Sequence, residues 1–185
     1  ATAVVLGMRS AAPPAVVPPR DAPPAANEPP PDGHPPVSIP DDVEMWKQLG
    51  FAQYRAGQVD RSYLAPAAES YDHVLSLKPT DLDALRTLGN IAYDRENTDA
   101  AIRYYQRYLE QKPDDISVLT DLGTMFLSAN NIPRAIATYE EVLASDPKFF
   151  QAQFNLAIAY RQSGDSAKAL DALRKSQEMA PDEET

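Results

Sequence analysis

The sequence contains no cysteine, which excludes disulfide bonds, thiolate metal sites, covalently attached c-type haem and cysteine nucleophiles. Histidine is almost as scarce, with two residues that lie far apart, His34 and His73, and we expect both on the surface. The sequence also has no glycine-rich phosphate loop, no histidine pair at metal spacing and no Gly-x-Ser-x-Gly motif. We therefore predict that the chain is not an enzyme and that it holds no catalytic site, metal or cofactor.

Long apolar runs are also missing, since no stretch approaches the roughly 20 apolar residues that a membrane span needs. The net charge of −10 repels phosphate groups, so nucleic acid and an anionic membrane surface are disfavoured as partners, and we expect no direct small-molecule ligand. Residues 1–8, ATAVVLGM, are apolar but short, and the chain starts without Met. We slightly favour the remnant of a membrane anchor or signal segment over an ordinary small-residue terminus. Membrane contact would then come only through sequence before Ala1. The compartment is not decided; a bacterial periplasmic or membrane-tethered location is favoured over a cytoplasmic one.

Glycine is scarce, with 7 residues, whereas proline is abundant, with 18. Twelve of the prolines lie at or before Pro40, so residues 1–40 differ in kind from residues 41–185. Proline fixes φ and removes amide donors, which predicts an extended polyproline II arm without helix or central strand. The arm would act as a spacer or as a docking strap on a partner, and we favour the spacer.

Residues 41–185 carry a repeated pattern in which Leu-Gly is followed by Ala, by an aromatic residue four positions later, and by Pro. The prolines are spaced by 34 residues, and each alanine precedes its proline by 12. In the last copy, Ala and Leu replace Gly and the aromatic residue. In order, the copies read Leu49-Gly50, Ala67, Tyr71, Pro79; Leu88-Gly89, Ala101, Tyr105, Pro113; Leu122-Gly123, Ala135, Tyr139, Pro147; and Leu156-Ala157, Ala169, Leu173, Pro181.

This pattern resembles the tetratricopeptide repeat, whose signature is W-x2-L-G-x2-Y, then A-x3-F, then P at a period of 34 residues. Trp46-x-x-Leu49-Gly50 matches the opening of that signature. The resemblance implies an all-α solenoid of four helix-turn-helix repeats in a right-handed superhelix, over residues 43–79, 82–113, 116–147 and 150–181. The prolines are expected to end the second helices, and Asp81, Asp114 and Asp115 to cap the following first helices.

Two departures from the pattern carry information. The first copy has five additional residues between its landmarks Leu49 and Ala67, where the other copies take 13 residues and this one takes 18. We expect a protruding loop that leaves Tyr63 and Leu64 partly exposed, as either a contact loop or a tolerated insertion. The last copy has Ser176-Gln177 where the others have an apolar pair, which suits a terminal repeat without a following neighbour.

In the tetratricopeptide family the first helices line a concave groove, so the resemblance assigns partner binding to the corresponding positions here. Members that capture a carboxylate-terminated peptide use a Lys/Asn/Asn/Lys/Arg clamp, but only Lys47 matches it, and Asp121 stands where a base is required. The groove should instead suit an amphipathic helix or an extended apolar segment, although Leu127 and Ile158 could equally be core. The candidates are Lys47, Phe51, Tyr54, Arg86, Asn90, Tyr93, Asp94, Asp121, Leu127, Phe154, Asn155, Ile158 and Arg161.

These features favour a protein–protein interaction scaffold that binds a partner segment in the groove. One alternative is a structural subunit of a stable, membrane-associated complex, with the arm as a docking strap. A lesser alternative is an accessory factor that presents a client protein to maturation machinery. The sequence does not identify the partner.

Overall fold

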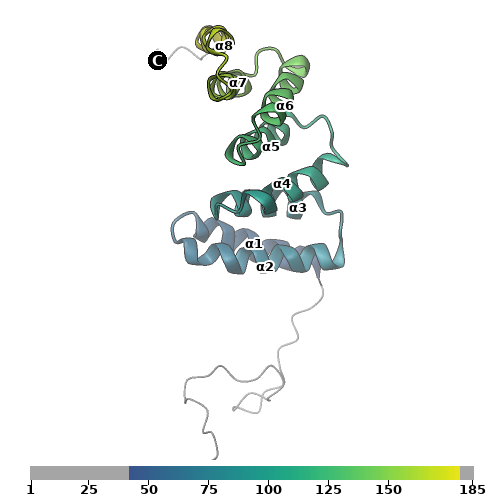
Figure 1. Ribbon diagram of the computed structural model, residues 1–185. Helices are drawn as coiled ribbons and strands as arrows, with labels where there is room; N and C mark the ends of the chain where they lie inside the picture. Colours follow the sequence, from purple (N-terminus) through teal and green to yellow (C-terminus); the bar gives the residue numbers. More distant parts are fainter. Residues whose placement is uncertain (1–41, 180–185) are drawn as a thin grey trace, which may run out of the picture. The chain divides into compact units, whose positions relative to one another are not determined.

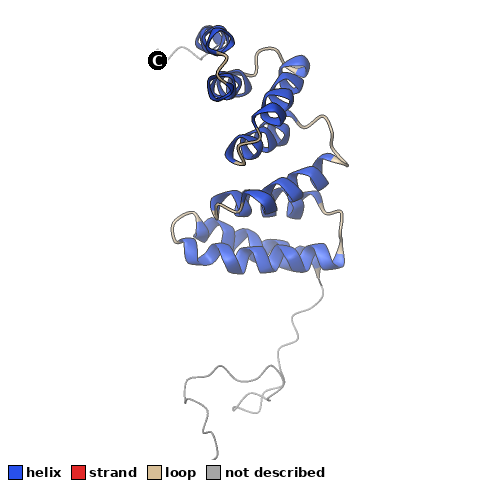
Figure 2. Cartoon of the chain, in the orientation of Figure 1, coloured by secondary structure: helices blue, strands red, loops and turns tan. Residues whose placement is uncertain are grey.

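The computed structural model describes residues 42–179, which form four consecutive pairs of α-helices (Figure 1). Between the helices the chain runs in short loops, and residues 42–179 contain no strand (Figure 2). The predicted arm, residues 1–40, lies outside the described residues, so the arm and the domain boundary stay predictions. The helices are α1 (Val43–Gly57), α2 (Leu64–Leu77), α3 (Leu82–Asp94), α4 (Thr98–Leu109), α5 (Ile116–Ser128), α6 (Ile132–Ser145), α7 (Phe150–Ser163) and α8 (Ser166–Met179), with a short 3-10 helix, η1 (Arg61–Tyr63), before α2.

The helix ends follow the turn chemistry of the sequence. Asp81 accepts a hydrogen bond from the Ala84 amide at 3.1 Å and so caps α3. Asp115 does the same for α5 through the Ser117 amide at 3.1 Å, whereas Asp114 lies exposed in the preceding turn and caps nothing. In the last three repeats, the turn between the paired helices places the same repeat position at positive φ. The residues are Glu96 (φ 60°), Asn130 (φ 57°) and Gly164 (φ 86°).

The two helices of each pair pack closely because a glycine on the first helix faces a tyrosine ring on the second. A Cβ atom built on Gly89 would lie 2.3 Å from Cε1 of Tyr105, and one on Gly123 would lie 2.6 Å from Cε1 of Tyr139. Gly50 and Tyr71 form the corresponding pair in the first repeat. The buried side chains join into one hydrophobic cluster that extends from α2 to α7. The prediction of an all-α solenoid of helix pairs is therefore confirmed.

Two predictions of exposure are wrong. Leu64 is 2% exposed, because η1 turns the additional residues back and places its side chain against Gly57, where a Cβ would lie 2.5 Å from Cδ2 of Leu64. Tyr63, next to it, is 46% exposed as expected. His73 is half-buried rather than on the surface, since its ring lies 4.2 Å from the Trp46 ring between α1 and α2.

The polar change in the last repeat fits the prediction at Gln177, which is exposed, but not at Ser176. Ser176 is 1% exposed and donates its hydroxyl hydrogen bond to the Leu173 carbonyl oxygen, so it does not solvate a terminal surface. Leucines on the same helix are exposed instead: Leu170 is 69% exposed and Leu173 is 37% exposed. The fourth pair therefore keeps an apolar surface that none of residues 42–179 covers.

Candidate functional site

The four first helices meet around one cavity of about 310 Å³, which we call the central cavity. Tyr54 reaches it from α1, and its hydroxyl donates to the Asp94 carboxylate of α3 at 3.2 Å. Burial, followed by the charge of Asp94, raises the pKa of Tyr54 to about 12, so the hydroxyl remains protonated at physiological pH. The lining residues are Tyr54, Asn90, Tyr93, Asp94, Tyr105, Asp121, Thr124 and Gln151.

Negative charge dominates the central cavity. Asp121 is half-buried, and burial raises the pKa of its carboxyl group, an effect that Asp115 reinforces and Arg86 opposes. Asp94 already accepts hydrogen bonds from Tyr54 and, at 3.1 Å, from the Gln58 side chain. The cavity can therefore receive a cationic or hydrogen-bond-donating group from a partner.

Aromatic side chains stand exposed on the same first helices. Phe51 of α1 is 55% exposed and has the Arg55 guanidinium 5.9 Å from its ring centroid. Tyr93 of α3 is 51% exposed, and Phe154 of α7 is 42% exposed with its ring stacked 6.3 Å from that of Phe150. Aromatic residues are enriched at the cores of protein interfaces.

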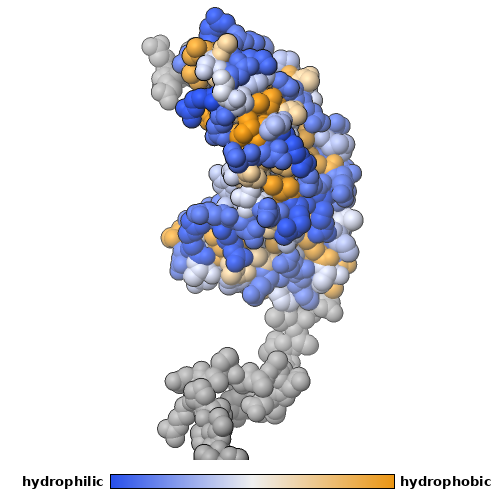
Figure 3. All heavy atoms as spheres, in the orientation of Figure 1, coloured by the Kyte–Doolittle hydropathy of each residue, from blue (hydrophilic) through white to orange (hydrophobic). Residues whose placement is uncertain are grey.

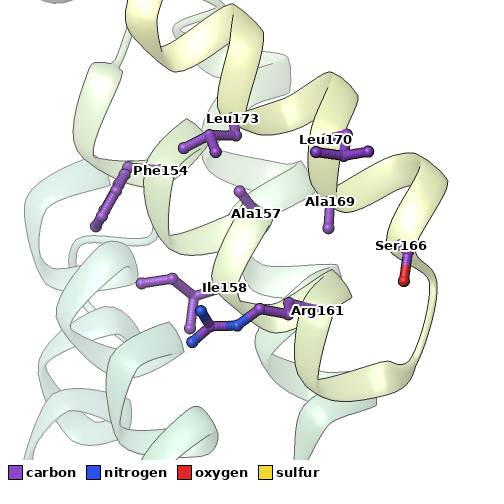
Figure 4. Close-up of a pocket in the computed structure, with 8 residues that line it drawn as sticks. All are labelled: Phe154, Ala157, Ile158, Arg161, Ser166, Ala169, Leu170 and Leu173. Atoms are coloured by element: carbon purple, nitrogen blue, oxygen red, sulfur yellow. The ribbon is translucent and has the colours of Figure 1, made fainter.

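A second cavity, of about 560 Å³, lies between α7 and α8, and we call it the α7/α8 groove (Figure 4). Phe154, Ile158 and Arg161 extend into it from α7, while Leu170 and Leu173 line it from α8 (Figure 4). Figure 3 shows the corresponding hydrophobic surface over this end of the repeat unit, beside a hollow in the face that is in view. Arg161 is the charged residue of this otherwise mostly apolar lining.

Within residues 42–179, no group of three or more His, Asp or Glu side chains could hold a metal ion. The same residues include no helix that is long and apolar enough to cross a membrane.

A family model described as "Tetratricopeptide repeat" matches residues 61–116 and 120–184. The chain belongs to the tetratricopeptide repeat family. No curated protein sequence matches the chain.

Solved structures of MamA share the fold. One, described as "Crystal structure of MamA", is 25% identical over 76% of this chain and 80% of its own, with a TM-score of 0.69. MamA of Desulfovibrio magneticus RS-1, residues 41 to the end, is 19% identical over 78% of this chain and 79% of its own, with a TM-score of 0.71. Tetratricopeptide repeats are protein-interaction modules, so this membership supports a protein–protein interaction scaffold.

The tetratricopeptide repeat unit brings some of the predicted site residues together and separates others. Tyr54, Asn90, Tyr93, Asp94 and Asp121 share the central cavity. The α7/α8 groove gathers a second set, Phe154, Ile158 and Arg161. Phe51 lines neither of these two cavities, and Arg86 is exposed on α3.

Three candidates are engaged within the fold. Lys47 pairs with Asp83 and lies 3.4 Å from the Asp81 carboxylate, so it joins the first repeat to the second. Leu127 is half-buried against the hydrophobic cluster. Asn155 donates to the Thr124 hydroxyl at 3.4 Å.

The sequence prediction missed the contributions of the second helices. Tyr105, an architectural landmark of the repeat, also lines the central cavity, where its hydroxyl donates to Asn90 at 2.9 Å. Leu170 and Leu173 of α8 were missed in the same way. One signal was available, namely the replacement of the repeated tyrosine by Leu173 in the last copy.

Proposed function

We propose that this tetratricopeptide repeat unit is a non-enzymatic scaffold that binds a segment of a partner protein across its first helices. The observation that carries the proposal is the pair of exposed aromatic rings, Phe51 at 55% and Tyr93 at 51%, on the helices that surround the central cavity. Burial of these two rings against a partner would remove a large apolar area from water and so stabilise the complex.

The central cavity specifies part of the partner's chemistry. Asp94 and Asp121 line the cavity together with Tyr93, and the chain as a whole carries a net charge of −10. A partner segment that offers apolar side chains to the rings and a lysine or arginine to the carboxylates fits this surface. The attraction between the opposite charges would also speed the association of the two proteins. The negative charge disfavours nucleic acid as the partner.

Photo-crosslinking combined with a matched aromatic pair tests the proposal. Tyr93 lines the central cavity, whereas Tyr63 of η1 is similarly exposed, at 46%, and lies outside that lining. A photoreactive amino acid at position 93 should cross-link a partner in the native cell, and the same group at position 63 should not.

The partner identified in this way is then titrated against Tyr93→Ala and Tyr63→Ala. Tyr93→Ala should weaken binding at least about tenfold, as expected of an anchor ring, and Tyr63→Ala should leave it within about twofold. Equal affinity of the two variants, with circular dichroism showing intact helices, would rule out binding at the central cavity. The alternative role as a structural subunit held by its arm depends on residues outside 42–179, and none of the described contacts favours it.

A further inference from the structure

In each of the first three repeats, the first helix of the next repeat packs against the helix pair. The α7/α8 groove is the corresponding surface of the fourth pair, so these three junctions indicate what kind of helix would cover it. The landmark leucine of the first helix is 38% exposed in α1 (Leu49) but only 2% in α3 (Leu88), 6% in α5 (Leu122) and 6% in α7 (Leu156). Since α1 alone among these four helices has no described repeat before it, the preceding repeat accounts for the burial of this position.

The same comparison identifies a three-residue stripe on each covered helix. In α3 the stripe is Ala84, Leu88 and Ile91, which are 0%, 2% and 1% exposed. Their spacing of four and three residues places them on one face of the helix. The stripe of α5 is Val118, Leu122 and Met125, and that of α7 is Ala152, Leu156 and Ala159, all at most 6% exposed.

A carboxylate follows this stripe in α3. Asp94 stands three residues after Ile91 and accepts the hydrogen bond from Tyr54 of the preceding first helix at 3.2 Å. In α7 the repeat position of Tyr54 is occupied by Arg161, which is exposed and lines the α7/α8 groove. A carboxylate at the Asp94 position of an incoming helix would therefore face a guanidinium group, an ion pair with suitable charges.

We propose that the α7/α8 groove binds an amphipathic helix of a partner protein. This helix carries a small apolar residue, a leucine and a further apolar residue at positions i, i+4 and i+7, with a carboxylate at i+10. It occupies the place that α3, α5 and α7 take on the preceding repeats, in the helix-in-groove mode. The inference rests on the proposed function only in treating the repeat unit as a binding scaffold, because the groove is distinct from the central cavity.

A second copy of the chain fits this groove less well. Its α1 carries Met45, Leu49 and Ala52 at the three stripe positions, which is a compatible apolar pattern. At i+10, however, it carries Arg55, which would face Arg161 and place two like charges together. The charge at this position therefore favours a foreign helix with an acidic residue over self-association.

The test uses the full chain and a labelled synthetic peptide with the α3 sequence, residues 81–95, stapled on its solvent face because a free helix of this length is unstable. Fluorescence anisotropy should show saturable binding to the chain. Leu173→Asp should weaken that binding at least about tenfold, and so should Leu170→Asp. Because the Leu170 side chain is 69% exposed, its replacement should leave the fold intact. The chain variant Tyr93→Ala should bind the peptide as the unchanged chain does, which separates this test from that of the central cavity.

Charge reversal tests the ion pair. A peptide with Asp94→Arg should bind the chain more weakly than the original peptide, and the chain variant Arg161→Glu should invert that preference. The proposal is overturned if the peptide does not bind or if both leucine variants bind it unchanged. It is also overturned if the chain self-associates in sedimentation and both Leu49→Asp and Leu173→Asp abolish that association, since a second copy would then be the occupant.

Discussion

Substitution of Gly89 by alanine tests whether the close approach of a glycine to a tyrosine ring sets the distance between paired helices. The Cβ atom that Gly89→Ala introduces would lie 2.3 Å from Cε1 and 2.6 Å from Cδ1 of Tyr105. Tyr105 is 2% exposed and its hydroxyl donates to Asn90, so the ring cannot rotate freely away. The helices must therefore separate or the ring must leave its rotamer.

Two effects of opposite sign compete in Gly89→Ala. Glycine in a helix interior is less favourable than alanine by about 0.8–1.0 kcal/mol, which would stabilise the variant. Overpacking a filled core costs about 1–3 kcal/mol, and so close a contact lies at the upper end of that range. We therefore expect the free energy of unfolding to fall by about 2 kcal/mol.

The fourth repeat supplies the compensating change, because Ala157 and Leu173 occupy the positions of Gly89 and Tyr105. In a Tyr105→Leu background the steric clash is absent, so Gly89→Ala should stabilise by about 1 kcal/mol through helix propensity alone. Urea denaturation followed by circular dichroism on the four members of this cycle measures a coupling of about 3 kcal/mol. If Gly89→Ala is neutral or stabilising while Tyr105 is present, the steric reasoning is wrong.

Three further predictions concern turns and carboxylates. Glu96→Gly should stabilise the chain by about 0.5–1 kcal/mol in urea denaturation, since Glu96 has φ 60° and glycine adopts this conformation without strain; Glu96→Ala should bring no such gain. Asp81→Ala should destabilise by about 1–2 kcal/mol at pH 7 through loss of the α3 cap. Burial acts to raise the pKa of Asp81, but the Ala84 amide, Lys78 and Lys47 together lower it below 3.8. The difference in unfolding free energy between wild type and Asp81→Ala should therefore vanish as the pH falls through that lowered value. Asp121→Asn should instead stabilise the chain at pH 7. Burial raises the pKa of Asp121 above 3.8, so the wild-type protein loses stability as the pH rises through the raised value. Below pH 3.8 the stabilities of wild type and Asp121→Asn should converge, which urea denaturation at several pH values measures.

The repeated landmarks were enough to predict the fold, because each has a local physical role that recurs in every copy. Gly89 permits close approach, Tyr105 fills the space that it leaves, and the 34-residue spacing of the prolines sets the length of each pair. The caps at Asp81 and Asp115 and the helix ends before Pro79 and Pro147 were predictable for the same reason, since a proline or a capping aspartate acts within one turn.

Exposure could not be predicted in the same way, because it depends on which element covers a residue. Leu64 lies in the lengthened turn, and only the 3-10 helix η1 brings it against Gly57. Lys47 carries the expected charge for a binding groove, yet Asp81 and Asp83 of the next repeat engage it. Tyr105 has an architectural role that the repeat pattern predicts, but the pattern does not show that the tyrosine also lines the central cavity.

The fourth repeat departs from the second and third at positions that the fold does not require to be apolar. Phe154 occupies the repeat position of Arg86 and Thr120, and Ile158 that of Asn90 and Thr124, so the same helix pair forms with polar residues there. Asn90 and Thr124 each hydrogen-bond the tyrosine hydroxyl of their own repeat. With Leu173 in place of the tyrosine, that hydroxyl is gone and Ile158 has no polar group to satisfy. The paired change converts a hydrogen-bonded junction into an apolar groove on a pair that none of residues 42–179 covers. A requirement of the core does not explain the change, whereas an apolar binding surface for a partner helix does.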